Sequence, residues 1–489
     1  MLLFADVDIS DRDLSFNDRY IPELLAKRLS QIEAIGDCYY GLPASYRGNL
    51  EGKDIFRINN ADDSSFWKSI FQKCGSDHIV KIYIDAPFLD PTIIAAMIDV
   101  HVKYLAEYTY SENLPAGFSC EIYSKELIAS LPETEEKTLS LTDIIRSNIN
   151  QFDVELFYHE PDIRDKRLSF RNSTPRDRRI METIYAHLGR VPAYSEISAV
   201  IASSPELLYV GPSYLEIELT GRCDLDCIFC YRKTLSSIHG DMEVDLYRKV
   251  LTEMKQFELP YSVCFGGSGE PLMHKNFYAI MELSQKEECI ETIVIETNGL
   301  YADDNLKSYL NATHDNRVKL IFNINGFDEE TYRSIHRYEG FTKVFNNILA
   351  LREVLSDGPQ LHLQIMKINE TEKFLDKYYD FWDTYGIPII LQKQNTYLGK
   401  IADRRYSDLS PLERTPCWHL QRDLYILSDG RVGFCKQDID GTYSKGSIEN
   451  ESLMDIWSRS KRYFLNDYQS NFATSPDCQS CDEWYTFNL

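Results

Sequence analysis

Three cysteines lie close together near the middle of the chain, at a spacing typical of metal and cluster sites. Cys223, Cys227 and Cys230 follow the alternating apolar run 214–220, which predicts a strand that ends in a loop. Three thiolates on one loop can hold three irons of a 4Fe-4S cube and leave the fourth iron without a protein ligand. An iron without a protein ligand can bind a reacting molecule directly.

The aromatic residue directly before the third cysteine helps to identify the motif. With Phe229 in this position, the loop resembles the radical S-adenosylmethionine (SAM) superfamily. In that family the open iron binds the amino and carboxylate groups of SAM, and one electron splits SAM into methionine and a 5′-deoxyadenosyl radical. The resemblance implies that the three cysteines are cluster ligands and catalytic residues, with Phe229 beside the cofactor. A structural zinc ion is the alternative, and its fourth ligand would be His239 or Cys264.

Length and charge narrow the class of protein. A chain of 489 residues suggests about three domains. The formal net charge of −24 argues against a nucleic-acid binder, because phosphate contacts need a basic face. No run approaches the ~18 apolar residues of a membrane span, and the first residues do not resemble a signal peptide. We therefore expect a cytoplasmic protein that contacts neither membrane nor nucleic acid.

The first 205 residues predict an α/β domain. The run 79–85 reads as a strand, and Asp90 can cap a helix that begins at Pro91. The runs 85–91, 108–118 and 165–170 resemble sugar-nucleotide cytidylyltransferases of GT-A-like fold, in which an aspartate at the position of Asp85 helps to hold Mg²⁺. That family also has a basic, glycine-rich phosphate loop. Here the first glycine is Gly36, and aspartates occupy the first twenty residues, at Asp6, Asp8, Asp11, Asp13 and Asp18. We expect a degenerate domain in which Asp85 is a turn carboxylate.

Residues 212–395 alternate between strand and helix patterns, which indicates repeated βα units and a parallel sheet. The predicted strands are 214–220, 261–265, 291–299, 317–326, 361–367 and 387–393. Six such units fit a partial (β/α)6 barrel of the radical SAM type. The active site is then expected at the carboxyl ends of the strands, where the cysteine loop lies.

Polar residues lie at or just beyond the carboxyl ends of three of these strands. A glycine-rich turn after the second strand lets backbone amides approach a ligand, and Glu270 adds a carboxylate suited to an amine. The turn resembles the second radical SAM motif, which implies contacts to the methionyl amino group of SAM from Ser268, Gly269 and Glu270. The next two strands resemble those whose ends contact the ribose and carboxylate of SAM. The candidates there are Thr297, Asn298, Asn323 and Asn325. The alternative is that these asparagines satisfy strand-end backbone groups.

Residues 396–489 carry a second set of cysteines: Cys417, Cys435, Cys478 and Cys481. A hairpin with an Asp-Gly turn lies between the first two and should bring them together. Four thiolates complete a 4Fe-4S cluster or a zinc site. The pattern resembles the SPASM/twitch extension in its single-cluster form, and the layout of the whole chain resembles the spiro-SPASM family.

These features predict a radical SAM iron–sulfur enzyme that abstracts hydrogen from a bound substrate. A fully ligated auxiliary 4Fe-4S cluster has no open iron, so we expect it to relay an electron. The resemblance implies a peptide or protein side chain as substrate and an external one-electron donor of flavodoxin or ferredoxin type. A sugar or sugar nucleotide is the alternative substrate. Outside this class, the chain could be a nucleotidyltransferase with an accessory cluster domain or a non-catalytic cluster scaffold.

Overall fold

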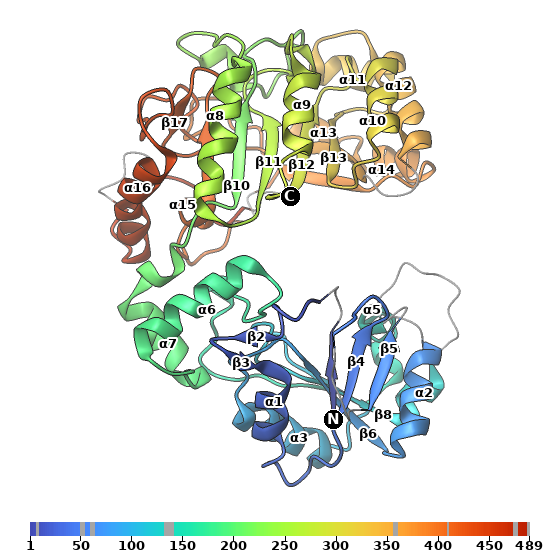
Figure 1. Cartoon of the computed structure of the whole chain (residues 1–489). Helices are drawn as coiled ribbons and strands as arrows, with labels where there is room; N and C mark the ends of the chain where they lie inside the picture. The colour runs from blue at the N-terminus through green and yellow to red at the C-terminus, as the bar shows by residue number, and fades with distance from the viewer. Residues whose placement is uncertain are drawn as a thin grey trace. The chain divides into compact units, whose positions relative to one another are not determined.

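The computed structural model describes residues 1–5, 9–48, 54–58, 64–131, 141–355, 360–407, 410–472 and 478–486. The chain folds into two compact units, Met1–Val210 and Gly211–Leu489 (Figure 1). In the described part of the chain, no helix combines the length and the apolar character that crossing a membrane requires. Division of the second unit into a core at 212–395 and a tail at 396–489 stays a prediction.

The first unit is built on a mixed sheet of order β5-β4-β1-β6-β8-β7-β9. Neighbours β5, β4, β1 and β6 are parallel, whereas β8 runs antiparallel to both β6 and β7. The strands are β1 (Leu2–Phe4), β4 (Tyr39–Pro43), β5 (Ile55–Ile58), β6 (His78–Tyr83), β7 (Tyr108–Tyr110), β8 (Glu121–Ser124) and β9 (Val154–Leu156). A separate ribbon pairs β2 (Ser15–Phe16) with β3 (Arg19–Tyr20).

One helix of the first unit begins at the start signal expected from the sequence. In α3 (Pro91–Lys103), the side chain of Asp90 accepts a hydrogen bond from the Thr92 amide at 3.0 Å, so the predicted cap is confirmed. The other helices are α1 (Ile21–Leu29), α2 (Ser64–Cys74), α4 (Lys125–Ser130), α5 (Leu141–Ser147), α6 (Pro175–Leu188) and α7 (Tyr194–Ser203).

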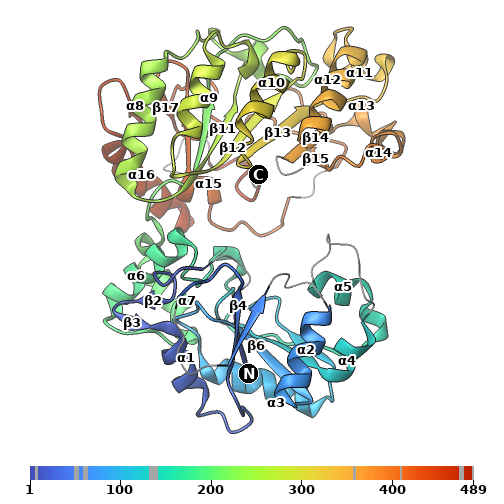
Figure 2. The same ribbon diagram turned by 45° about the vertical axis from the view of Figure 1, so that its right-hand side comes forward.

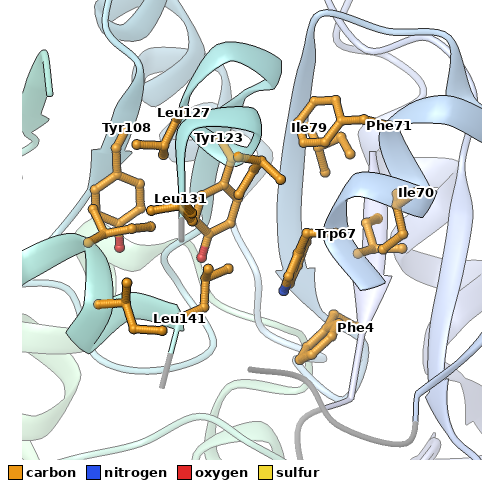
Figure 3. Packing of buried hydrophobic residues seen from close by; sticks show 14 of the residues in the cluster. Phe4, Trp67, Ile70, Phe71, Ile79, Tyr108, Tyr123, Leu127, Leu131 and Leu141 are labelled. Carbon is orange, nitrogen blue, oxygen red and sulfur yellow. The ribbon is translucent and has the colours of Figure 1, made fainter. Parts of the chain in front are cut away.

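Aromatic side chains fill the core between the sheet and its helices. Trp67 of α2 stacks on Phe4 of β1 with ring centroids 5.7 Å apart, and it meets Tyr123 of β8 at 5.3 Å (Figure 3). Leu127 and Leu131 close the other side of Tyr123, and all five residues are buried. Burial of large rings contributes most of the stabilisation of such a core.

Asp85 lies directly after β6, where the cytidylyltransferase resemblance would place a metal-binding carboxylate. It is fully buried, and both of its oxygens accept hydrogen bonds. Arg171 Nε donates to Oδ1 at 2.7 Å and the Ser173 amide donates to Oδ2 at 3.0 Å. The Arg171 guanidinium also lies over the Tyr83 ring. These contacts agree with a structural carboxylate at the turn. Asp6 and Asp8 lie outside the described residues, and the GT-A-like fold stays a prediction.

The second unit contains the predicted parallel strands. Strands β10 to β15 pair in chain order, each parallel to the next, and the sheet does not close. This confirms the partial barrel. The strands are β10 (Tyr214–Glu218), β11 (Tyr261–Gly266), β12 (Ile290–Thr297), β13 (Val318–Asn323), β14 (Gln360–Lys367) and β15 (Ile389–Lys393).

Helices connect these strands, and Figures 1 and 2 show α8, α9, α10 and α12 along the outer face of the sheet. This is the βα arrangement expected of a parallel sheet. The helices are α8 (Val244–Met254), α9 (Phe277–Gln285), α10 (Asp304–Thr313), α11 (Glu329–His336), α12 (Phe341–Val354), α13 (Asn369–Glu372) and α14 (Leu375–Asp383).

The C-terminal residues extend the same sheet. β16 (Asp423–Ile426) pairs in parallel with β10, and the antiparallel strands β17 (Arg431–Gly433) and β18 (Gly446–Ser447) follow it. Gly430 in the predicted Asp-Gly turn has a φ of +81°, which favours glycine. The helices here are α15 (Trp418–Arg422) and α16 (Leu453–Tyr468). The hairpin strand β16 therefore lies beside β10, the strand that leads into the cysteine loop.

Candidate functional site

The three central cysteines line one cavity of about 200 Å³. Their loop runs from the end of β10 to the short helix η4 (Tyr231–Thr234). Its base is fixed by Arg222, which donates to Asp241 and to the carbonyl of Met273 at 2.7 Å. The loop thus lies at the carboxyl ends of the strands, as the partial barrel predicts.

Each of the three sulfurs faces a nitrogen donor. Asn298 Nδ2 lies 3.7 Å from Cys223 Sγ, and the Arg232 amide lies 3.4 Å from Cys230 Sγ. His336 Nδ1 lies 3.1 Å from Cys227 Sγ. Burial raises the pKa of all three thiols, so thiolates form here only when a bound cation compensates for their desolvation. Three buried thiols with N–H donors fit an iron–sulfur cluster.

The glycine-rich turn after β11 packs directly against the cysteine loop. A Cβ atom at Gly269 would lie 2.0 Å from the carbonyl oxygen of Thr220, so only glycine fits there. Gly267 has a φ of +90° and approaches Glu218. The amide of Glu270 donates to the Arg222 carbonyl at 2.7 Å. Ser268, Gly269 and Glu270 therefore line the same cavity as the cysteines.

Glu270 is buried, yet its carboxylate is only partly satisfied by the protein. Oε1 accepts from Thr297 Oγ1 at 2.7 Å and from the Leu272 amide at 3.2 Å, and Oε2 accepts from the Asn298 amide at 2.8 Å. Burial raises the pKa of Glu270 to about 7. A carboxylate has about four acceptor positions, so one remains for a ligand. An ammonium group would donate a hydrogen bond to this free position and place a positive charge beside the buried carboxylate.

The other predicted SAM contacts divide into two groups. Phe229, Asn298 and Asn323 line the cavity. Thr297 and Asn325 are not among its lining residues, because Thr297 donates to Glu270 and the side-chain carbonyl of Asn325 accepts from the Met366 amide at 2.7 Å. For Asn325 the structure agrees with the alternative of a strand-end backbone contact.

The barrel interior changes from apolar to polar toward this cavity. Tyr214, Cys264, Val294 and Ile321 form a buried apolar layer, with Ile390 packed against it. Two residues further along each strand, on the same face, come Glu216, Gly266, Glu296, Asn323 and Gln392. All of these except Glu216 line the cavity, together with Gln364 and Asn395. The space beside the cysteines is thus lined with amides and with the carboxylates of Glu270 and Glu296.

Two residues near the site join its parts in a way that the sequence did not indicate. Glu218 of β10 is fully buried and accepts hydrogen bonds from His239 Nδ1 at 2.7 Å, from the Ser268 hydroxyl and from the Ser428 hydroxyl at 3.2 Å. It thereby joins the glycine-rich turn to the segment after β16. His239, the second of the two residues, extends this network to Arg431 through Nε2.

The zinc alternative at the first site lacks both of its candidate fourth ligands. His239 uses Nδ1 for Glu218 and has Nε2 3.3 Å from Arg431 Nη2, so both ring nitrogens are engaged. Cys264 lies in the apolar layer of the barrel and does not line the cavity. Neither residue faces the three cysteines, which leaves a three-thiolate site.

The four tail cysteines surround a second, smaller cavity. Cys417 precedes α15 and Cys435 follows β17, while Cys478 and Cys481 come from the last described segment, so the hairpin does bring the first two together. Gln437 also lines this cavity, and its buried amide has no hydrogen-bond partner among the described residues. An unpartnered amide beside four thiols fits a bound group that carries sulfur acceptors.

No group of three or more His, Cys, Asp or Glu side chains that could hold a single metal ion occurs among the described residues. A 4Fe-4S cube is larger than a single ion, and each cysteine would hold a different iron of it. The first cavity offers three cysteine sulfurs to such a group, and the second offers four.

Two family models match the second unit. The radical SAM superfamily model matches residues 217–381, and an iron-sulfur cluster-binding domain, SPASM, matches residues 417–482. An uncharacterized protein of Treponema pallidum is 27% identical over 72% of this chain and 99% of its own length. The tungsten-containing aldehyde ferredoxin oxidoreductase cofactor-modifying protein of Pyrococcus furiosus is 24% identical over 55% of this chain and 86% of its own.

Solved structures give weaker matches. Streptococcus suis SuiB bound to precursor peptide SuiA has a TM-score of 0.43 at 12% identity, over 54% of this chain and 69% of SuiB. A cytidylyltransferase from Leptospira borgpetersenii has a TM-score of 0.36 at 17% identity, over 42% of this chain and 94% of its own. The radical SAM match contains the three central cysteines, and the SPASM match contains the four tail cysteines. The chain therefore carries a radical SAM domain at residues 217–381 followed by an iron-sulfur cluster-binding SPASM domain at residues 417–482, and it is an iron–sulfur enzyme.

Proposed function

We propose that this enzyme binds SAM in the cavity of the second unit and uses it to abstract hydrogen from a peptide or protein side chain. The observation that carries the proposal is that Cys223, Cys227, Cys230 and Glu270 line one cavity. The three cysteines would hold a 4Fe-4S cluster. When bound, the cluster and SAM supply reductive cleavage to methionine and a 5′-deoxyadenosyl radical.

Glu270 and the turn before it would orient SAM. The remaining acceptor position of Glu270 suits the methionyl ammonium, while the backbone of Ser268 and Gly269 lies close enough to the cysteine loop to position the same group. Asn298 and Asn323 line the cavity further along and would contact the ribose or the carboxylate. The chain thereby holds the reactive part of SAM against the cysteines.

The substrate would occupy the polar part of the cavity. Glu296, Gln364, Gln392 and Asn395 offer both donors and acceptors, which can pair with the amides of a peptide. Hydroxyl groups would pair equally well with these side chains. This lining, together with the cytidylyltransferase resemblance of residues 1–205, supports a sugar or sugar nucleotide as the second candidate.

The four tail cysteines would hold an auxiliary 4Fe-4S cluster. Because four thiolates leave no open iron, its role would be to accept an electron from the substrate radical, and the substrate would lose a proton in the same net oxidation. An external donor of flavodoxin or ferredoxin type would supply the electron for SAM cleavage.

Anaerobic reconstitution of the full chain with iron and sulfide tests the proposal. We expect about eight irons per chain and release of 5′-deoxyadenosine from SAM under dithionite. Iron and released nucleoside are measured on the same sample. A fully loaded protein that binds SAM without cleaving it, with or without a peptide extract, would contradict the radical reaction. Transfer of a nucleotide from CTP to a sugar acid would instead revive the nucleotidyltransferase interpretation.

Replacement of Glu270 tests the SAM contact. In Glu270→Gln, an amide NH₂ group replaces one carboxylate oxygen. In one orientation it faces the donating amide of Asn298, and in the other it faces the donors of Thr297 and Leu272. We expect SAM to bind about 30-fold more weakly, a loss of about 2 kcal/mol, with unchanged iron content. Equilibrium binding of SAM to reconstituted protein measures this. Glu291→Gln, at an exposed position of β12 outside the cavity, is the control. Equal affinity of Glu270→Gln and Glu291→Gln for SAM would exclude a contact between Glu270 and SAM.

A further inference from the structure

We propose that His336 is a positioning residue that donates a hydrogen bond from Nδ1 to Cys227 Sγ and raises the reduction potential of the cluster held there. The inference rests on the proposed ligation by Cys227. His336 is the last residue of α11, lies 109 residues from Cys227 in the chain and is 1% exposed. The spacing of the cysteine motif does not single it out.

The hydrogen-bond partners of the ring decide which nitrogen carries the proton. The backbone amide of Asn325 lies 3.0 Å from Nε2, and a backbone amide can only donate. Nε2 is therefore the acceptor, and in the neutral ring the proton must lie on Nδ1. Nδ1 is 3.1 Å from Cys227 Sγ, so its N–H donates to the sulfur.

The cysteine loop and α11 are joined so that this contact is held in place. The Asp226 amide donates to the His336 carbonyl at 3.4 Å, and the Ile228 amide donates to the Ile335 carbonyl at 3.0 Å. These bonds cap the end of the helix with the residues on either side of Cys227. The ring of Tyr332 packs on the imidazole with centroids 4.3 Å apart and restricts its rotation.

A hydrogen bond to a ligating thiolate disperses negative charge on the sulfur. It stabilises the reduced cluster more than the oxidised one, because the reduced cluster carries one more negative charge. His336 should therefore make the cluster easier to reduce. Removal of the donor should shift the midpoint potential to a more negative value.

Redox titration followed by electron paramagnetic resonance tests this on the full chain. The cluster at the three-cysteine site is recognised by the change in its signal when SAM is added. In His336→Leu, we expect the reduced-to-oxidised ratio at a fixed potential to fall about tenfold, which corresponds to about 59 mV for one electron. His336→Asn can still present an N–H near the position of Nδ1 and should restore much of the ratio. Tyr332→Phe, which removes a hydroxyl without a partner among the described residues, should leave it unchanged.

An unchanged midpoint potential in a loaded His336→Leu protein would overturn this inference and leave the proposed function intact. Iron retained at the first site in Cys227→Ala would overturn the ligation itself, so the two failures are distinguishable. If His336→Leu does not load a cluster, wild-type protein labelled with ¹⁵N-histidine decides instead. We expect a histidine nitrogen coupling in the pulsed spectrum of the reduced cluster, and its absence would reject the hydrogen bond.

Discussion

Cys227→Ala protein is expected to hold about four fewer irons per chain than the wild type and to release 5′-deoxyadenosine only at the level seen without reductant. Alanine removes one of three thiolates from the cavity, and the remaining two cannot hold a cube with a single open iron. The four-cysteine site uses other residues and should keep its irons. Iron analysis and chromatography of the nucleoside measure both effects.

A matched cysteine variant controls for general damage. Cys289 is partly buried, precedes β12 and lines neither cysteine cavity. Cys289→Ala should therefore keep both the iron content and the release of 5′-deoxyadenosine. Reductant-dependent release from Cys227→Ala at the Cys289→Ala rate would contradict the assignment of the central cysteines.

Much of the second unit was predictable because its signals are local. Each strand is an apolar run of the right length, and the cysteine loop and the glycine-rich turn directly follow two of them. In a parallel sheet, consecutive strand ends meet at one edge, so linear order is enough to assemble this part of the site. The structure accordingly brings Cys223 and Glu270 together in one cavity.

The contacts that depend on side-chain direction were less predictable. Asn323 is the last residue of β13 and points into the barrel, as its strand position requires. Asn325 lies beyond the end of the strand, where the alternation of faces no longer holds, and its side chain turns to the backbone of β14. Residue type suggested the same role for both, but only the strand fixes a direction.

Long-range polar partners left no pattern in the sequence. Glu218 meets Ser428 across 210 residues, and His336 meets Cys227 across 109. Such pairs come together only after several βα units have packed. The parallel pairing of β16 with β10 is also a long-range contact that the sequence did not indicate. The Asp-Gly turn predicted the tail hairpin, but nothing predicted that the hairpin would pair with β10. This pairing places the four tail cysteines in the same unit as the central three.

The double variant Cys478→Ala/Cys481→Ala is expected to separate SAM cleavage from substrate oxidation. Two of four thiolates are lost from the second cavity, so about four irons should remain, all at the first site. Release of 5′-deoxyadenosine should continue, because Cys223, Cys227, Cys230 and Glu270 are unchanged. Oxidised product should fall about 100-fold, because the electron left on the substrate no longer has the auxiliary cluster as its acceptor.

The measurement compares the variant with wild type in a peptide extract supplied with SAM and dithionite. Mass spectrometry follows peptides that lose two hydrogens, and the nucleoside is measured in parallel. Gln437→Ala serves as a milder companion, because it removes the unpartnered amide beside the cysteines while all four thiolates remain. Undiminished product from the double variant would remove the relay role and leave the second cluster a structural one, since electron transfer to it would then be unnecessary for the oxidation.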